Sequence, residues 1–469
     1  MDLKYEKLIK NIVIFTVGSF GTRILSFLII PLYTFVLTTE EYGKIDLFVT
    51  SINLMLPFST LMIQESLIRL IPTNEIDKKV AITNSVVVVI GGVLLNFFLI
   101  PFYKYGLNFG EYTFLFIIIL SLNIYNTVFS QYLRAIEKNI GFIVFGFLNT
   151  LIMLSCNILF LLYFKFGMIG YYYSIFISQL VCAFYLSIYN NIFKNFNIKD
   201  IQFSKLIIML KYSIPLIPNN LMWWIMGAGD KYILNYFLGD SANGIYSISM
   251  KIPTIISMIY NVFMQAWQFS AIEENNSKDN KIFYQNVFSI ISSIIILVTS
   301  VINLIVYPIF LFFLNEAYLS AWNYVPIICI ATIFNCSSTF AGVTYIVMKN
   351  SSRAFITTFL GVLINIIFNF ILIKYIGLYG VAIGTAIGYL TVMCIRFFDM
   401  KKAQNISLNS KKFSISILIL SIEVFFLINI ENKIKLLIIE IFVIIIIFII
   451  FFKEIKIIIL FLYNKINKK

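Results

Sequence analysis

The sequence predicts an all-α integral membrane protein of about fourteen transmembrane helices, arranged as two six-helix bundles related by an internal parallel repeat plus a C-terminal helix pair. Three observations support this fold class. The 469 residues are 60% hydrophobic and only 12% charged, whereas soluble globular chains are about 45–50% apolar and about 25% charged. Long apolar stretches recur along the chain, and its two halves share sequence patterns.

The apolar stretches define the expected spans. A bilayer core about 30 Å thick requires about 20 mostly apolar helical residues. Stretches of this kind lie at 12–37, 45–68, 80–102, 112–133, 141–164, 168–192, 212–238, 242–270, 284–314, 318–346, 354–373, 379–397, 413–430 and 435–452. We therefore expect bundles at 1–193 and 212–402, a cytoplasmic linker with a surface helix at 194–211, and helices 13 and 14 with a basic tail at 403–469.

The basic residues set the orientation. With a cytoplasmic N-terminus, 26 of the 35 Lys and Arg residues, Arg396 among them, fall in inner loops and 6 in outer loops. This asymmetry follows the positive-inside rule and places both termini in the cytoplasm. The net charge of +13 is thus mainly a topology signal, and we expect no nucleic-acid partner.

Two pairs of segments indicate the repeat. TFVLTTEEYGKIDLF resembles NYFLGDSANGIYSIS, so that Leu37 and Leu238 correspond at an offset of 201. FKFGMIGYYYSIFISQL resembles IKYIGLYGVAIGTAIGYL, so that Gly167 and Gly170 correspond to Gly377 and Gly380. Six spans per unit give two repeats of the same orientation, an arrangement found in secondary transporters.

Several kinds of chemistry are disfavoured. The chain has no histidine, so Ser/His and Cys/His nucleophile pairs and His-ligated metal sites are excluded. Its five cysteines lie in apolar runs without a CxxC pair, and no Walker motif is present. We expect no catalytic residue, no metal site and no cofactor, and therefore not an enzyme. A membrane-embedded glycan polymerase or ligase is disfavoured because the outer loops are short.

Three cations, Arg23, Lys231 and Lys251, remain inside the spans. A charge at the bilayer centre costs at least about 2.5–3.5 kcal/mol and usually faces a cavity or a partner. For Arg23 and Lys251 we favour a substrate cavity over an internal ion pair. Pro253 should kink the eighth span just after Lys251.

Acidic residues accompany these cations. Asp230 and Lys231 are adjacent and point about 100° apart on a helix, so they do not neutralise each other face to face. Glu65 and Arg69, spaced i,i+4, are expected to form an ion pair, and Asp46 is expected to be solvated near the outer surface. For Glu423 and Glu440, in the C-terminal helix pair, packing and function remain equally open.

Several segments carry a resemblance to a known family. GSFGTRILSFLIIPLYTFVLTTEEYGKIDL, QESLIRL, QYLRAIEKN, YSIPLIPNNLMWWIMGAGDKYILNYFLG and GIYSISMKIP resemble the Wzx-type O-antigen and capsule repeat-unit flippases. These form part of the polysaccharide-transporter branch of the multidrug/oligosaccharidyl-lipid/polysaccharide exporter superfamily. The resemblance covers spans one to twelve and implies a flippase in the bacterial cytoplasmic membrane, moving undecaprenyl-diphosphate-linked oligosaccharide to the outer leaflet by alternating access.

The resemblance also implies roles for residues. Arg23, Lys251 and Lys231 would bind the diphosphate, although a lysine at 231 lacks the bidentate fork of the family's arginine. Neutral polar residues, Asn219, Asn220 and Gln265, are candidates for sugar contacts. Because the chain has no nucleotide-binding motif, we expect coupling to an H+ or Na+ gradient, with Asp230 or Glu65 as the titrating or ion-binding carboxylate. Arg69 and Asp46 are the other residues expected in ion coupling or charge pairing. Polysaccharide polymerase and assembly proteins are the expected partners. The alternatives are a multidrug or organic-cation antiporter and a lipid-II-type flippase.

Overall fold

The computed structural model describes residues 29–273, 280–348, 350–406, 408, 411–430, 433–456 and 460. Helices account for nearly all of them and no strand occurs in these ranges, which confirms the all-α fold class. The chain forms two compact units, one ending at Trp224 and the other beginning at Ile225. The domain boundaries expected at 193, 211 and 402 stay a prediction.

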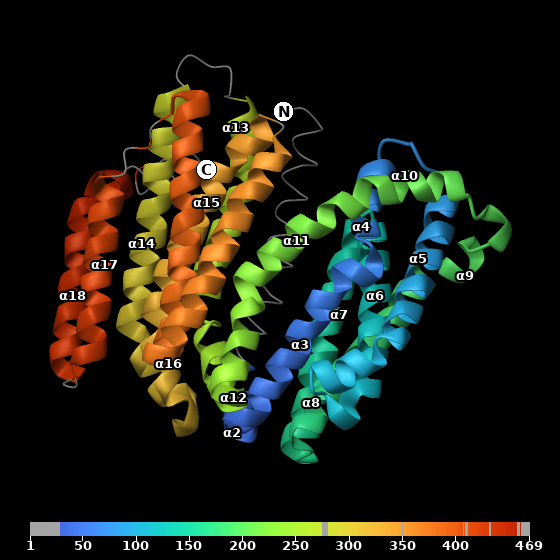
Figure 1. Cartoon of the computed structure of the whole chain (residues 1–469), viewed down its shortest axis with the longest axis horizontal. Helices are drawn as coiled ribbons and strands as arrows, with labels where there is room; N and C mark the ends of the chain where they lie inside the picture. Colours follow the sequence, from blue (N-terminus) through green and yellow to red (C-terminus); the bar gives the residue numbers. More distant parts are fainter. Residues whose placement is uncertain are drawn as a thin grey trace. The chain divides into compact units, whose positions relative to one another are not determined.

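The first unit consists of helices joined by short turns (Figure 1). Its elements are α2 (Ile30–Val36), α3 (Thr39–Thr60), α4 (Ile63–Leu70), α5 (Lys78–Phe98), η1 (Phe102–Gly106), η2 (Gly110–Tyr112), α6 (Thr113–Ala135), α7 (Asn139–Asn157), η3 (Ile158–Tyr163), α8 (Gly167–Tyr189), α9 (Ile192–Asn195), η4 (Ile198–Asp200), α10 (Phe203–Ser213), η5 (Ile214–Leu216) and α11 (Ile217–Trp224).

The second unit holds the remaining helices. Its elements are η6 (Ile225–Gly229), α12 (Asp230–Ser249), α13 (Thr254–Glu273), α14 (Asn280–Phe313), η8 (Glu316–Tyr324), α15 (Val325–Val347), α16 (Ser351–Gln404), α17 (Lys411–Asn429) and α18 (Lys433–Ile450). The hairpin of α17 and α18, red in Figure 1, packs beside α14.

Many of these helices are long and apolar enough to cross a bilayer. Among the described residues there are eight, or up to ten if each of two bent helix pairs is one span. The 54-residue α16 counts once, yet it holds two expected spans on either side of a break at Ile376 and Gly377. The protein is therefore a multi-pass membrane protein.

The internal repeat is visible in the backbone. Gly167, which begins α8, and Gly377, at the break in α16, have φ values of +56° and +55°, a region that favours glycine. Three residues further on, a Cβ at Gly170 would lie 3.1 Å from Phe160 Cβ, and one at Gly380 would lie 2.4 Å from the Leu372 carbonyl carbon. The paired glycines thus share a positive φ at the first position and a close neighbour in the preceding helical segment at the second.

The two bends fall where backbone groups are not helical. Leu61 and Met62 both lie in the left-handed region between α3 and α4, and these two helices meet at 59°. The helices on either side of Lys251 meet at 48°, across the turn that contains Pro253. This confirms the kink expected in the eighth span.

The expected linker helix packs against the first unit. α10 buries Leu206 and Met209 and contacts α4 and α5. Just before it, Gln202 exchanges two backbone–side-chain hydrogen bonds with Asn84 of α5, at 3.2 and 3.4 Å. The Lys205 ammonium donates to the Glu75 carbonyl at 3.2 Å. These contacts tie the start of the seventh expected span to the first unit.

The packing of α3 on α5 depends on one glycine. A Cβ at Gly92 would lie 1.9 Å from the Ser59 carbonyl oxygen, whereas one at Gly91 would meet nothing within 4 Å. One turn further on, Asn96 Nδ2 donates to Ser59 Oγ at 2.8 Å. The two helix backbones are therefore nearly in contact at Gly92.

Candidate functional site

A buried carboxylate begins α12. The preceding residues form a π turn, η6, and such turns often occur at functional sites. Asp230 is the first residue of α12 and is only 1% exposed. A buried carboxylate requires compensating donors or a cation, so its partners decide what it can do.

Two hydroxyl groups hold one oxygen of this carboxylate. Tyr246, in the second half of α12, donates its hydroxyl to Asp230 Oδ2 at 3.1 Å. Thr385, from the second leg of α16, donates to the same oxygen at 3.3 Å. Asp230 Oδ1 is buried and has no hydrogen-bond donor among the described residues. This oxygen is thus able to take a proton or a cation.

The hydrogen bonds continue into the first leg of α16. Asn365 Nδ2 donates to Thr385 Oγ1 at 3.3 Å, and Asn369 Nδ2 donates to Asn365 Oδ1 at 3.4 Å. Asn369 Oδ1 is buried and lacks a donor within the described ranges. We call Asp230, Tyr246, Asn365, Asn369 and Thr385 the Asp230 cluster. It offers acceptor oxygens from three helical segments in an apolar surrounding.

A glycine allows the two legs of α16 to meet at this cluster. A Cβ at Gly384 would lie 2.1 Å from Asn369 Oδ1. The absence of a side chain at 384 therefore makes room for the asparagine. The break at Gly377 turns the chain back so that Asn369 and Thr385 come from neighbouring legs of one long helix.

The two described intramembrane lysines are placed differently. Lys231 is half-buried in the first turn of α12, directly after Asp230. Lys251 is also half-buried and lies in the turn between α12 and α13, with its amide donating to the Ile248 carbonyl at 3.0 Å. No acidic side chain pairs with Lys251 in the part of the chain that the structure describes. Its ammonium is thus available to an anion.

Other predicted site residues do not join the Asp230 cluster. Arg23 lies outside the described residues. Asn219 is half-buried and Asn220 exposed, both on α11, and Gln265 is exposed on α13. Their assignment to sugar contacts stays a prediction.

The ion pair expected between Glu65 and Arg69 is not formed within the described chain. Instead the exposed Arg69 guanidinium lies over the Tyr212 ring of α10, 5.1 Å from its centroid. The helix spacing allowed the pair, but the ring of a packed neighbouring helix is an alternative partner for the cation.

Asp46 is not a solvated surface residue either. Its side chain is half-buried, with Oδ2 inaccessible to solvent. It lies within electrostatic range of the hydroxyls of Tyr42, one turn earlier on α3, and Tyr171 of α8. The expectation was wrong because α3 packs against α8, which places a tyrosine hydroxyl of α8 near the carboxylate.

Arg396 was assigned to an inner loop but is buried, with 4% of its surface exposed. Its guanidinium donates to the Ser338 carbonyl at 3.2 Å, to Thr357 Oγ1 at 3.2 Å and to Thr358 Oγ1 at 2.9 Å. A Cβ at Gly342 would lie 2.6 Å from Arg396 Nη1. Arg396 thus joins α15 to both legs of α16. In the sequence, only the small residues of these helices could have indicated that the arginine is buried.

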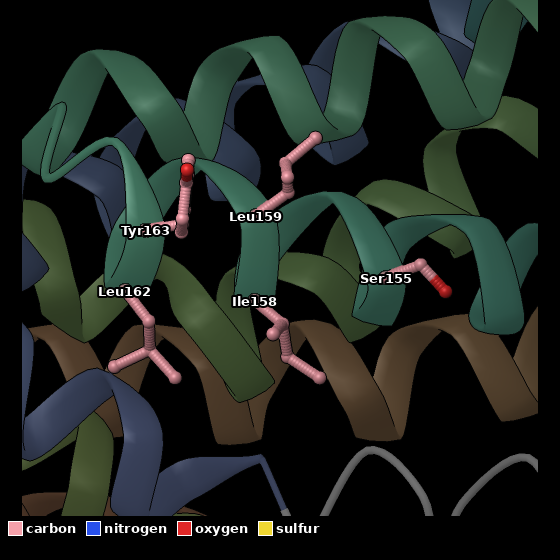
Figure 2. Close-up of a pocket in the computed structure, with 5 residues that line it drawn as sticks. All are labelled: Ser155, Ile158, Leu159, Leu162 and Tyr163. Carbon is pink, nitrogen blue, oxygen red and sulfur yellow. The ribbon is translucent and has the colours of Figure 1, made fainter.

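One cavity of the first unit is unsuited to a charged headgroup. It measures about 450 Å³ and lies along the end of α7 and η3. Figure 2 shows its five lining side chains: Ser155, Ile158, Leu159, Leu162 and Tyr163. Ile158 and Leu162 point to one side of the helix and Leu159 and Tyr163 to the other, with no charged group among them.

Comparison with solved structures shows the fold. The lipid II flippase MurJ in an inward closed conformation has a TM-score of 0.69 at 16% identity, and the match covers 94% of this chain and 98% of that chain. An inward-facing multidrug resistance MATE family transporter of the MOP superfamily has a TM-score of 0.65 at 14% identity, over 82% of this chain and 94% of that chain. A MOP superfamily transporter from Pyrococcus furiosus has a TM-score of 0.61 at 14% identity, over 84% and 96%.

The family is shown by sequence. No curated protein matches the chain. A family model described as "Polysaccharide biosynthesis protein" matches residues 8–269, more than half of the chain. The matched region includes the start of α12 and the turn at Lys251. The chain therefore belongs to the polysaccharide biosynthesis protein family and has the fold of the transporters of the multidrug/oligosaccharidyl-lipid/polysaccharide exporter superfamily.

Proposed function

We propose that the protein is a flippase that moves undecaprenyl-diphosphate-linked oligosaccharide from the cytoplasmic to the outer leaflet of the bacterial cytoplasmic membrane. Alternating access driven by an H+ or Na+ gradient would power the movement. The observation that carries the proposal is the Asp230 cluster, a buried carboxylate with a free acceptor oxygen in a chain of the polysaccharide biosynthesis family. Both termini would face the cytoplasm, where most basic loops lie.

The Asp230 cluster is suited to couple an ion to a conformational change. The ion would bind Asp230 Oδ1 and the amide oxygen of Asn369, because both acceptors are buried without a donor within the described chain. Ion binding would neutralise the carboxylate and draw the start of α12 toward both legs of α16. A ligand shifts a conformational equilibrium only by its differential affinity for the two states, and a site built from three segments gives such a difference.

The substrate headgroup requires cations. Lys251 is available to an anion, Lys231 follows Asp230 directly, and Arg23 is the third cation that the sequence predicts inside a span. A lysine ammonium binds a phosphate as a point charge with charge-assisted hydrogen bonds. Asn219, Asn220 and Gln265 are proposed to contact the sugars, and polysaccharide polymerase and assembly proteins are the proposed partners.

A lipid-II-type flippase is the second candidate. The MurJ match covers 94% of this chain, which extends the likeness to the C-terminal hairpin region. Both substrates are lipid diphosphates, so the lysines do not separate them. A multidrug antiporter would favour acidic groups for its cationic substrates over the intramembrane lysines of this chain.

We expect Lys251→Ala to reduce surface glycan at least about tenfold, because one charge-assisted hydrogen bond contributes about 1.5–3 kcal/mol. The measurement is complementation in a strain that lacks its own repeat-unit flippase, with surface glycan normalised to the amount of protein in the membrane. Lys251→Arg should retain export. Lys104→Ala, which removes an exposed lysine of η1, is the matched control.

Wild-type export by well-expressed Lys251→Ala would contradict the headgroup assignment. A second arm tests the substrate, by expression in cells depleted of their lipid II flippase. If these cells survive while the first strain does not regain surface glycan, the substrate is lipid II and not the proposed oligosaccharide.

A further inference from the structure

A second set of buried polar groups lies between the C-terminal hairpin and α14. It consists of Asn303 of α14, Glu423 of α17 and Glu440 of α18, which are 0%, 1% and 6% exposed. Asn303 Nδ2 donates to Glu423 Oε2 at 3.1 Å. We call these three residues the hairpin acid cluster. All three helices belong to the second unit, and Figure 1 shows the hairpin beside α14.

Two acceptors of the hairpin acid cluster have no donor. Glu423 Oε1 and Asn303 Oδ1 are both buried without a hydrogen-bond partner in the described ranges. The titratable groups within electrostatic range of Glu423 are Cys329 of α15 and Glu440 of α18. No lysine or arginine of the described chain contacts Glu423. A buried carboxylate in an apolar surrounding, with a second carboxylate in electrostatic range, favours a proton or a cation beside it.

A cavity leads to this cluster. It measures about 230 Å³ and lies between α14, η8 and α18. Glu440 forms part of its wall, together with Tyr307, Pro308, Trp322 and Leu436. The volume is ample for a small ion, since one water occupies about 30 Å³ of liquid. Polar groups in the wall are contributed by Glu440, Tyr307 and Trp322.

We propose that the hairpin acid cluster is a binding site for a small monovalent cation, H+ or Na+, separate from the Asp230 cluster. The cation binds Glu423 Oε1 and Asn303 Oδ1 and is balanced by the carboxylate of Glu423. It fixes α17 to α14, because it joins Glu423 of α17 to Asn303 of α14. The proposal does not depend on the transported substrate, since it concerns how the hairpin is held.

The test is thermal unfolding of the purified full-length protein in lipid nanodiscs. The background is Asp230→Asn, which removes the carboxylate of the other cluster. We expect the Tm to rise by about 3 °C when NaCl replaces choline chloride or when the pH falls from 9 to 6 in choline chloride. The first response identifies Na+ and the second H+. A ligand at about 100 times its Kd stabilises by about 2.7 kcal/mol, and a chain of this length gains about 1 °C per kcal/mol.

Adding Glu423→Gln to the Asp230→Asn background should abolish this response. Glu316→Gln, which removes an exposed carboxylate of η8, should leave it intact. If the Glu423→Gln variant does not fold, Glu440→Gln is measured in the same way, and the infrared carbonyl band of a protonated carboxyl is compared with the background protein. No cation response in the Asp230→Asn background, or a response that survives both glutamine substitutions, overturns the proposal.

Discussion

Asp230→Asn is expected to abolish ion-coupled transport while the protein remains folded. The substitution removes the carboxylate charge of the Asp230 cluster but keeps an oxygen that accepts the hydroxyls of Tyr246 and Thr385. Loss of a buried charge partner costs about 3–5 kcal/mol, so the affinity for the coupling ion should fall at least about 100-fold. The loss of coupling is measured in proteoliposomes, as the movement of labelled lipid-linked oligosaccharide between leaflets under an H+ or Na+ gradient.

The matched control is Asp240→Asn on the same helix. Asp240 Oδ1 accepts a hydrogen bond from Asn235 Nδ2 at 2.5 Å, and an asparagine at 240 preserves that acceptor. We expect its transport to respond to the gradient as the wild type does. Equal gradient-driven transport by Asp230→Asn and Asp240→Asn would show that the coupling ion binds elsewhere.

The largest loss of stability is expected for Gly92→Ala. The added Cβ would lie 1.9 Å from the Ser59 carbonyl oxygen and 2.8 Å from its carbonyl carbon. Because both atoms belong to the backbone of α3, a side-chain rotation cannot relieve the overlap and the two helices must separate. Overpacking typically costs 1–3 kcal/mol and occasionally more, so we expect the free energy of unfolding to fall by about 3 kcal/mol or more.

The neighbouring residue provides the control, since Gly91→Ala meets nothing within 4 Å. Alanine is favoured over glycine in a helix by about 1 kcal/mol, so this variant should be as stable as the wild type or more so. Thermal unfolding in detergent compares the two. A Gly92→Ala protein with the Tm of Gly91→Ala would mean that α3 and α5 are further apart than described.

The membrane class, the paired glycines and the kink after Lys251 could be predicted from sequence because they depend on local signals. Gly167 and Gly377 both adopt a backbone conformation that few other residues adopt. The requirement for glycine at both positions is therefore recognisable in the sequence. Pro253 likewise marks the turn after Lys251, where the 48° bend occurs. Apolar span length indicated the membrane class.

The arrangement of polar groups inside the units could not be predicted in the same way. Asp230 was identified as a candidate from its charge, but its partner Thr385 lies 155 residues further along the chain. Asn365 and Asn369 carry no charge, so nothing in the sequence distinguished them from other amides. Arg396 was assigned to a loop from its position, yet hydroxyls and a carbonyl of α15 and α16 hold it inside. Such contacts depend on which helices pack together, and span counting carries no information about that.

The attachment of α10 to the first unit has a mechanical consequence. The contacts of Gln202 and Lys205 hold α10 to α4, α5 and the turn before α5, and the first unit continues to Trp224. The chain therefore passes from one unit to the other after α11, not in the polar linker before α10. The crossing falls at the start of the π turn η6, which leads directly into Asp230. In the proposed mechanism, the coupling ion would therefore bind directly after the segment that connects the two units.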